Sequence, residues 1–567
     1  MFSDLLLFTW LGFLCNHATA SPVVRIEKSQ ISYRGTTVDS IEHFQNVKFA
    51  QDTSGKRRFA PPELYTPPVG SEVDASTAGT ACPQVRAAMP PFFAETTDIS
   101  EDCLNLRISR PAGTTSDSNL PVVVWVHGGG VVKGSAYDPH SEPDEFLKLS
   151  QSINKPVIYI AINYRLTIFG FARLPILQDR KSLNVGIRDQ RAGFQWITPY
   201  GLSAGGTFTS LHLMAYGGEE GVPFTQAWMM SGPPGTALNM SSDATTLHTQ
   251  AVAEKVGCKS SEEYSVANHP PTGLFTFIPS VDGDLFPDRQ SVLYKAGKFV
   301  KNIPMVFGWN QDDGAMNFGP AHLIQTGNDM IPAIENFAHT LTAEDFSSLF
   351  SLYDADDFTE DVKNYEAQKD ESELTVSHSN AADPTFAGTR LYVLNQSMLT
   401  PLWKGAGMPY VGVSHGSDTN YIFNGVIPEG QISEEDQKLS RDSAEAFINF
   451  AYTGNPSTPG SGFGEWPEAF PDTESGVEAS GPRAINVEVI GGPYGTGPVQ
   501  VAVEPAESLD TEGEYGAEEG LDQQKLSGSN VGAMDSRVAS VRKKEVEREL
   551  LLKRCAFINS LAEKLGN

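Results

Sequence analysis

Two continuous apolar runs constrain the fold of this chain. The first, at 121–130, is Pro-Val-Val-Val-Trp-Val-His-Gly-Gly-Gly, and the second, at 156–162, is Pro-Val-Ile-Tyr-Ile-Ala-Ile. Apolar runs without polar alternation are typical of strands buried on both faces, as in a mostly parallel sheet covered by helices. Helical periodicity over 187–197 and 207–216 follows them. Further strands are expected at 226–230, 304–308, 389–394 and 409–413. Strands that alternate with helices predict an open α/β architecture.

Composition narrows the classes of partner. Hydrophobic residues make up 40% of the 567 residues, enough to form a large core. The formal net charge of −29 disfavours binding to nucleic acid and to anionic membranes, which are themselves negatively charged. We find no His-Glu-x-x-His motif and no cysteine–histidine cluster in the sequence, and therefore expect neither a metal nor a cofactor.

The amino terminus has the pattern of a secretory signal. An apolar run over 5–15 is followed by Ala18-Thr19-Ala20, a small-x-small cleavage site. The run is too short to cross a bilayer, and no other segment reaches a transmembrane length. We therefore expect a signal peptide at 1–20, secretion of the chain, and a mature chain at 21–567 that forms a single domain without a membrane-spanning segment.

In an oxidising compartment the cysteines can form disulfides. The cysteines that remain after cleavage are Cys82, Cys103, Cys258 and Cys555. Cys82 and Cys103 could close a 20-residue loop. N-glycosylation sequons occur at Asn239 and Asn395.

The carboxyl-terminal part differs in composition from the rest. The segment 503–536 is acidic and glycine-rich, and we expect it to be a mobile surface segment. The segment 537–564 has the pattern of a closing amphipathic helix.

The tightest local motif is Gly-Leu-Ser-Ala-Gly-Gly at 201–206. A G-x-S-x-G sequence between a strand and a helix forms a turn so sharp that its flanking positions must be nearly free of side chains. This makes Ser203 a candidate nucleophile, with the N–H of Ala204 facing a developing oxyanion. A second match contains Ser414. It is disfavoured because the residues that follow, 417–420, are expected to form a loop.

Other motifs supply candidate partners for Ser203. His127-Gly-Gly-Gly130 ends a buried strand, where glycine N–H groups can approach a ligand closely and serve as oxyanion donors. A nucleophilic serine also needs a base and an orienting carboxylate. His415 follows the expected strand at 409–413, and Asp312 and Asp313 follow the strand at 304–308.

These motifs together resemble the type-B carboxylesterase/cholinesterase family, and most closely its secreted fungal members. The matching segments, in order, are 101–106, 127–130, 163–166, 184–190, 281–284, 308–314, 413–418 and 449–455. The resemblance implies an α/β-hydrolase fold with a large, mostly parallel central sheet flanked by helices. It implies a carboxylic ester hydrolase that works through an acyl-enzyme, on a small-molecule or lipid-like ester.

The resemblance also implies roles for individual residues. The catalytic set it implies is Ser203 as nucleophile, His415 as base and Asp313 as acid, with Asp312 as the fallback and Asp where the family usually has Glu. The implied oxyanion hole consists of the N–H groups of Gly129, Gly130 and Ala204, and the implied disulfide is Cys82–Cys103. Cholinesterase activity is disfavoured because no Trp lies between these cysteines to bind a choline cation.

Three segments are shorter than the family pattern, near 197–200, 258–280 and 370–385. Between the expected helix and Ser203, residues 197–200 must supply both a loop of about 2–6 residues and a strand of about 5–6 residues, and we expect that both do not fit. Two alternatives to an active esterase therefore stay open: a non-catalytic binding or adhesion protein on the same fold, and the inactive product of an incomplete gene model. The sequence does not define the ester or the oligomeric state.

Overall fold

The computed structural model describes residues 21–194, 199–232, 240–241, 244–258, 276–314, 327–335, 341–352, 388–408, 411–423, 427, 431–470, 483–492, 495–503, 557 and 561. The expected signal peptide, the acidic segment beyond 503, and all of the expected carboxyl-terminal helix except 557 and 561 lie outside this range. So do most of 258–280 and all of 370–385. Among the described helices, none is long and apolar enough to cross a membrane.

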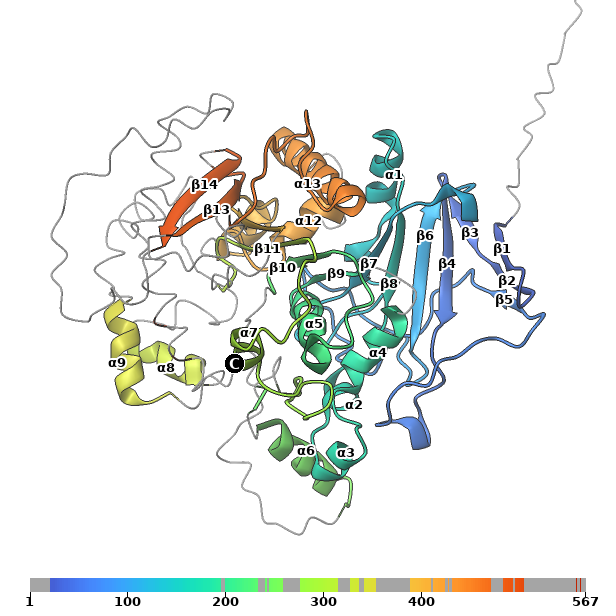
Figure 1. Ribbon diagram of the computed structural model, residues 1–567, viewed down its shortest axis with the longest axis horizontal. Coiled ribbons are helices and arrows are strands. Elements are labelled where there is room, and N and C mark those ends of the chain that lie inside the picture. The colour runs from blue at the N-terminus through green and yellow to red at the C-terminus, as the bar shows by residue number, and fades with distance from the viewer. Residues whose placement is uncertain are drawn as a thin grey trace, which may run out of the picture.

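An eleven-stranded sheet forms the centre of the molecule (Figure 1). Its strands, in spatial order, are β14 (Gly497–Val503), β13 (Arg483–Ile490), β12 (Thr389–Leu394), β11 (Met305–Asn310), β10 (Ala227–Met230), β9 (Pro199–Leu202), β7 (Val122–Val126), β8 (Ile158–Ile162), β6 (Asn105–Pro111), β4 (Ile41–Lys48) and β3 (Thr36–Val38). Neighbouring strands from β13 to β8 are parallel, and the pairs at both edges are antiparallel. A smaller sheet contains β1 (Val23–Ile26), β2 (Ile31–Arg34) and β5 (Glu72–Asp74). The expected mostly parallel sheet is confirmed.

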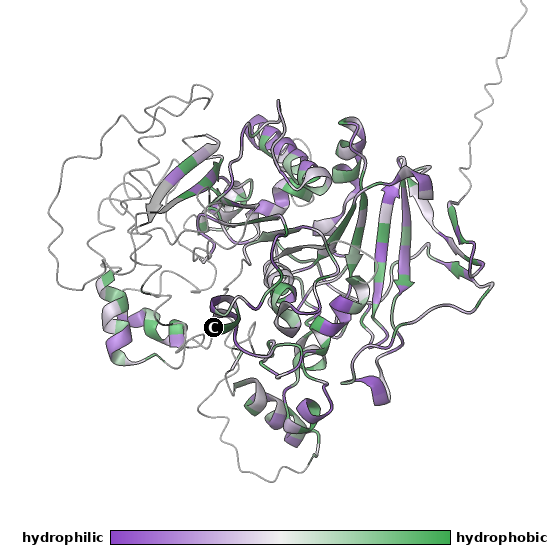
Figure 2. Cartoon of the chain, in the orientation of Figure 1, coloured by the Kyte–Doolittle hydropathy of each residue, from purple (hydrophilic) through white to green (hydrophobic). Residues whose placement is uncertain are grey.

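The apolar runs are buried on both faces, as predicted. Along β7, Val124 and Val126 belong to one hydrophobic core, while Val123 and Trp125 belong to a second core. Successive side chains of a strand point to opposite faces, so a run without alternation supplies both cores. In Figure 2 the central strands β7 and β8 are mainly hydrophobic.

Helices cover both faces of the sheet. One core includes side chains from α4 (Val185–Phe194) and α5 (Ala204–Met214), and the other includes side chains from α1 (Asp144–Ser152), α12 (Ser417–Phe423) and α13 (Glu434–Thr453). Figure 1 shows these two groups on opposite sides of β7, β8 and β9. The remaining described α-helices are α2 (Thr167–Phe171), α3 (Pro175–Asp179), α6 (Ala244–Lys255), α7 (Gln290–Lys295), α8 (Gly327–Glu335), α9 (Ala343–Leu352) and α11 (Thr400–Gly405).

Two expectations about the strands are wrong. The strand before Ser203 is present: β9 pairs with β7 through Trp125↔Tyr200 and with β10 through Met230↔Leu202. Partners on both sides supply backbone hydrogen bonds, so a four-residue strand suffices here. Conversely, the strand expected at 409–413 is absent over its described part, 411–413, and residues 409–410 lie outside the described range. The pairing next to this segment is an isolated parallel bridge between Asp312 and Ser414.

Candidate active site

Ser203 occupies a sharp turn between β9 and α5. Its φ of 54° and ψ of −124° lie in a region that side-chain-bearing residues rarely adopt, and such strain persists only where the surroundings impose it. The Ser203 N–H donates to the carbonyl of Met230 at 2.7 Å, and its carbonyl accepts from the Thr207 N–H at 2.9 Å. The elbow predicted from the sequence is therefore present.

The glycine after this turn is required by packing. A Cβ on Gly205 would lie 2.0 Å from the carbonyl oxygen of Val126 at the end of β7. A Cβ on Gly232 would similarly lie 2.2 Å from the carbonyl oxygen of Ser203. The amino end of α5 can lie this close to the sheet only because both positions lack side chains.

The glycine loop, residues 128–134, follows β7 beside the elbow. Gly129 and Gly130 have φ values of +103° and +56°, a backbone that glycine adopts without strain. Within the described part of the chain, we find no hydrogen bond from the N–H groups of Gly129, Gly130 or Ala204. Ala204 begins α5, where the helix dipole favours negative charge. These amides are free to receive an anionic oxygen.

His415 and Asp313 form a hydrogen-bonded pair. Nδ1 of His415 bonds to Oδ1 of Asp313, and Oδ2 of Asp313 accepts the backbone N–H of Asn310 at 3.1 Å. The Asp313 carboxylate is thus held by the end of β11 and leaves Nε2 of His415 for another partner. The His415 side chain is 36% exposed, so part of it is accessible from solvent.

Asp312 faces a different partner. Its Oδ2 accepts the Val413 N–H at 2.8 Å, and its own N–H donates to the Val413 carbonyl at 3.0 Å. Asp312 is 3% exposed and joins the loop that carries His415 to the end of β11. Of the two candidate acids, the structure brings Asp313 to His415.

Ser414 is unsuited to attack a substrate, although for a different reason than expected. The residues after it form α12 rather than a loop, so that part of the sequence argument is wrong. Ser414 is nevertheless 0% exposed. Its backbone also lacks the positive φ that Ser203 has in the elbow.

The elbow and the His–Asp pair lie at the carboxyl ends of the central parallel strands. Ser203 follows β9 and Asp313 follows β11, and β10 lies between them. Ser231 follows β10, and its N–H donates to the Gly308 carbonyl at 2.9 Å. Its hydroxyl oxygen accepts a hydrogen bond from Nδ2 of Asn310 at 3.1 Å. Binding and catalytic residues of open α/β sheets commonly lie where the parallel strands end. Here the neighbouring strands β9, β10 and β11 fix the relative positions of Ser203 and Asp313.

Burial and charge set the proton affinities around His415. Burial lowers the pKa of His415, but the Asp313 carboxylate, with a smaller contribution from Asp418, overrides it, so the net pKa is raised. Burial raises the pKa of Asp418 to about 6, although its carboxylate accepts the Tyr392 hydroxyl at 2.7 Å. Burial lowers the pKa of His127 to about 4, so this histidine is neutral and serves as a packing residue stacked on Tyr164.

The loop closed by Cys82 and Cys103 places two aromatic residues beside the site, and the sequence analysis did not identify them. The disulfide itself is confirmed, with a Cα–Cα distance of 5.0 Å. A Cβ on Gly129 would lie 3.2 Å from Phe93, and a Cβ on Gly416 would lie 3.2 Å from Phe92. The available signal was an aromatic pair directly after Pro90-Pro91.

The remaining cysteines and the sequons have no contact with Ser203, His415 or Asp313 among the described residues. Cys258 is exposed and unpaired within the described residues, and Cys555 lies outside them. The sequon at Asn239 lies outside as well. Asn395 is half-buried after β12, and the hydroxyl of its sequon residue Ser397 bonds to Ser417 at 2.8 Å.

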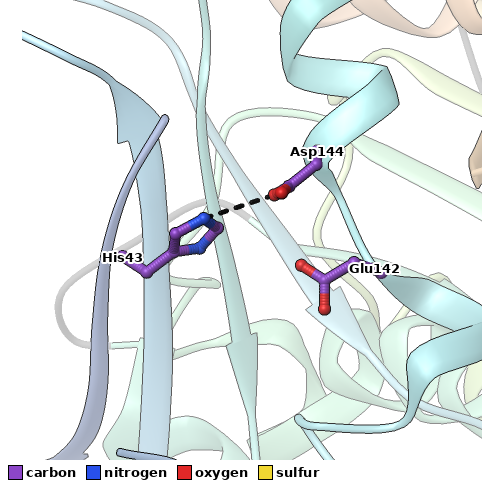
Figure 3. Close-up of side chains that lie close together, drawn as sticks. All are labelled: His43, Glu142 and Asp144. Carbon is purple, nitrogen blue, oxygen red and sulfur yellow. Dashed lines mark ion pairs between the residues drawn. The ribbon is translucent and has the colours of Figure 1, made fainter. Parts of the chain in front are cut away.

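Figure 3 shows a separate polar cluster in which His43 on β4 faces Glu142 and Asp144 near the start of α1. Nε2 of His43 lies 3.4 Å from Oδ1 of Asp144, and Nδ1 lies 3.0 Å from the Ser109 hydroxyl. Arg107 donates to both carboxylate oxygens of Glu142, at 2.9 and 2.5 Å. Because this guanidinium already holds Glu142, it would repel a metal cation. Burial lowers the pKa of His43, so the cluster joins β4, β6 and the start of α1 through the Arg107–Glu142 ion pair and the polar contacts of His43.

A model of the carboxylesterase family matches residues 20–480. The chain belongs to this family. It is 31% identical to the inactive carboxylesterase-like protein VdtD of Byssochlamys spectabilis, over 80% of this chain and 87% of that protein. It is 30% identical to a secreted lipase of Arthroderma benhamiae, over 78% and 85%, and 25% identical to the para-nitrobenzyl esterase of Bacillus subtilis, over 75% and 89%.

Solved structures agree on the fold. EstA of Aspergillus niger matches with a TM-score of 0.66 and 20% identity, over 97% of this chain and 99% of that one. A thermophilic pNB esterase matches with a TM-score of 0.63 and 21% identity, over 85% and 98%. The expected α/β-hydrolase fold is confirmed, and membership of the carboxylesterase family supports ester hydrolysis as the general chemistry of this chain's relatives.

Proposed function

We propose that this chain is an active serine hydrolase of carboxylic esters, with Ser203 as nucleophile, His415 as base and Asp313 as acid. The observation that carries the proposal is the His415–Asp313 pair at the same sheet edge as the strained Ser203. Structural packing alone gives no reason to hold a serine at φ 54° beside unoccupied amides.

The reaction follows from these positions. His415 Nε2 takes the Ser203 proton as the serine oxygen attacks the ester carbonyl, and Asp313 stabilises the imidazolium through Nδ1–H. The amides of Gly129, Gly130 and Ala204 stabilise the oxyanion, each contributing about 3 kcal/mol to lowering the barrier. The imidazolium then protonates the departing alcohol, and an acyl-enzyme remains. Water, activated by His415, releases the carboxylic acid and regenerates Ser203.

The substrate in this proposal is a small-molecule or lipid-like ester. Several relatives are named secreted lipases, and the apolar run with Ala18-Thr19-Ala20 is present in this chain. We accordingly infer that the signal peptide at 1–20 is removed and that residues 21–567 are exported as one domain, with Asn239 and Asn395 as glycan acceptors.

A non-catalytic binding protein on the same fold is the second candidate. It is favoured by the relative that is named an inactive carboxylesterase-like protein. The two candidates differ in one observable, the reactivity of Ser203.

The deciding experiment is hydrolysis of p-nitrophenyl butyrate by the secreted chain, together with labelling by a fluorophosphonate. Turnover and labelling should both disappear in Ser203→Ala. They should persist in Ser414→Ala, a matched control in which a fully buried serine loses the same oxygen. A folded wild type with neither turnover nor label would refute the esterase proposal and favour the binding protein.

A further inference from the structure

Lys133 is a fully buried lysine in the glycine loop, with an exposed fraction of 0%. Its ammonium donates to the carbonyls of Val85 and Arg86, at 3.1 and 3.4 Å, and to the hydroxyl of Thr96 at 3.1 Å. All three acceptors are uncharged and lie in the disulfide loop, residues 82–103. A buried ammonium is costly unless its donors are satisfied, so these bonds hold the two loops together.

Further contacts join the same two loops. Oε1 of Gln84 accepts a hydrogen bond from the Gly134 N–H at 2.9 Å, and Nε2 of Gln84 donates to the Gly134 carbonyl at 2.8 Å. The Val85 N–H donates to the Val132 carbonyl at 3.2 Å. The disulfide loop therefore holds the glycine loop along residues 132–134, with Lys133 at the centre of this contact.

The backbone of Lys133 in turn contacts Gly129. The Lys133 N–H donates to the Gly129 carbonyl at 3.1 Å. A Cβ on Gly129 would lie 2.1 Å from the Lys133 carbonyl oxygen, so the two backbone segments are in direct contact. A shift of Lys133 would therefore displace Gly129 and, through the chain, the adjoining Gly130.

We propose that Lys133 is a positioning residue of the oxyanion hole: its ammonium anchors the glycine loop to the disulfide-closed loop and so sets where the Gly129 and Gly130 N–H groups point. This inference rests on the proposed esterase function, because it assigns a task within that reaction. Lys133 itself touches no reacting atom.

Lys133→Met tests the proposal, because methionine keeps most of the buried chain and removes the three donors. The glycine amides should then lose their alignment, and a displacement of about 1 Å at a catalytic group lowers turnover by about 100-fold. We expect kcat for p-nitrophenyl butyrate to fall by 10- to 100-fold, with KM changed less than about two-fold, since donors aimed at the oxyanion act mainly in the transition state.

A second substrate separates positioning from general structural damage. In the thionoester analogue, sulfur replaces the carbonyl oxygen and accepts hydrogen bonds poorly, so its hydrolysis depends less on the oxyanion donors. Lys133→Met should therefore lower the oxygen-to-sulfur ratio of kcat/KM by about 10-fold or more. An equal loss on both substrates would overturn the proposal and leave Lys133 a structural residue only.

Matched controls complete the design. Lys155→Met removes a different lysine, which lies just before β8 and whose ammonium binds Asn449 on α13, and it should leave the ratio unchanged. If Lys133→Met does not fold, Thr96→Val removes one of the three acceptors and should lower the ratio by a smaller factor; an unchanged ratio in that variant would also overturn the proposal. Fluorophosphonate labelling of wild-type Ser203 distinguishes these outcomes from a failure of the esterase function itself.

Discussion

Replacing Asp313 by Asn tests the reasoning about the His–Asp pair with almost no change in volume. Asp313 accepts from His415 Nδ1 through one oxygen and from the Asn310 N–H through the other. An amide can keep only one of these bonds as an acceptor, because its NH₂ group donates. The bond that is lost either frees the end of β11 or places His415 in the wrong tautomer.

The expected cost is large. An isosteric Asp-to-Asn change in the triad of a serine protease lowers kcat by about 10⁴-fold, and, if the proposed triad operates, we expect a similar factor here. The pH profile should also move. His415 acts as a base only when neutral, so kcat/KM falls as the pH drops through its pKa. Asp313 holds that pKa above the ordinary value, so the acid limb of Asp313→Asn should lie at lower pH than that of the wild type.

Asp312→Asn is the matched control, since it makes the same chemical change one residue away. Asp312 contacts the Val413 backbone rather than His415, so its loss should cost about 1–3 kcal/mol of unfolding free energy and less than about ten-fold in kcat. Steady-state rates from pH 5 to 9 and urea denaturation of both variants measure these effects. A larger loss of kcat in Asp312→Asn than in Asp313→Asn would refute the assignment.

Two further predictions follow from packing and burial. Gly205→Ala places a Cβ 2.0 Å from the Val126 carbonyl oxygen and should lower the free energy of unfolding by about 3 kcal/mol or prevent folding. The control Gly405→Ala, whose Cβ would have no atom within 4 Å, should cost less than about 0.5 kcal/mol. Urea denaturation measures both, and equal effects would contradict the packing argument. Asp418, with its pKa raised from 3.8 to about 6, contributes stability that is present below pH 3.8 and lost as the pH rises through 6. Relative to Asp418→Asn, the wild type should therefore lose on the order of 3 kcal/mol of unfolding free energy between pH 4 and 7, and parallel pH curves for the two proteins would exclude this titration.

Local chemistry was sufficient for the parts of the site that one short segment encodes. The G-x-S-x-G motif at 201–205 predicted the elbow, because only glycine tolerates the contact that Gly205 makes with Val126. The run at 121–126 predicted a strand buried on both faces, which is β7. In each case a short stretch of sequence was enough to predict the element.

Contacts between distant segments decided the rest. β9 is a strand because β7 and β10 bind it on both sides, and no property of residues 199–202 alone predicts this. Lys133 was overlooked for the same reason, since its acceptors lie 37 to 48 positions earlier in the chain.

By itself, the sequence determined the α/β architecture, the elbow serine and the glycine loop, since these depend on apolar runs and on positions where only glycine fits. It left Asp312 and Asp313 as two candidates, because two adjacent carboxylates at a strand end are chemically identical. The family resemblance favoured Asp313, and the tertiary structure brings that residue to His415. The loop that carries His415 approaches β11 from about 100 positions away, and it lies beside the side chain of Asp313 while Asp312 turns to the Val413 backbone.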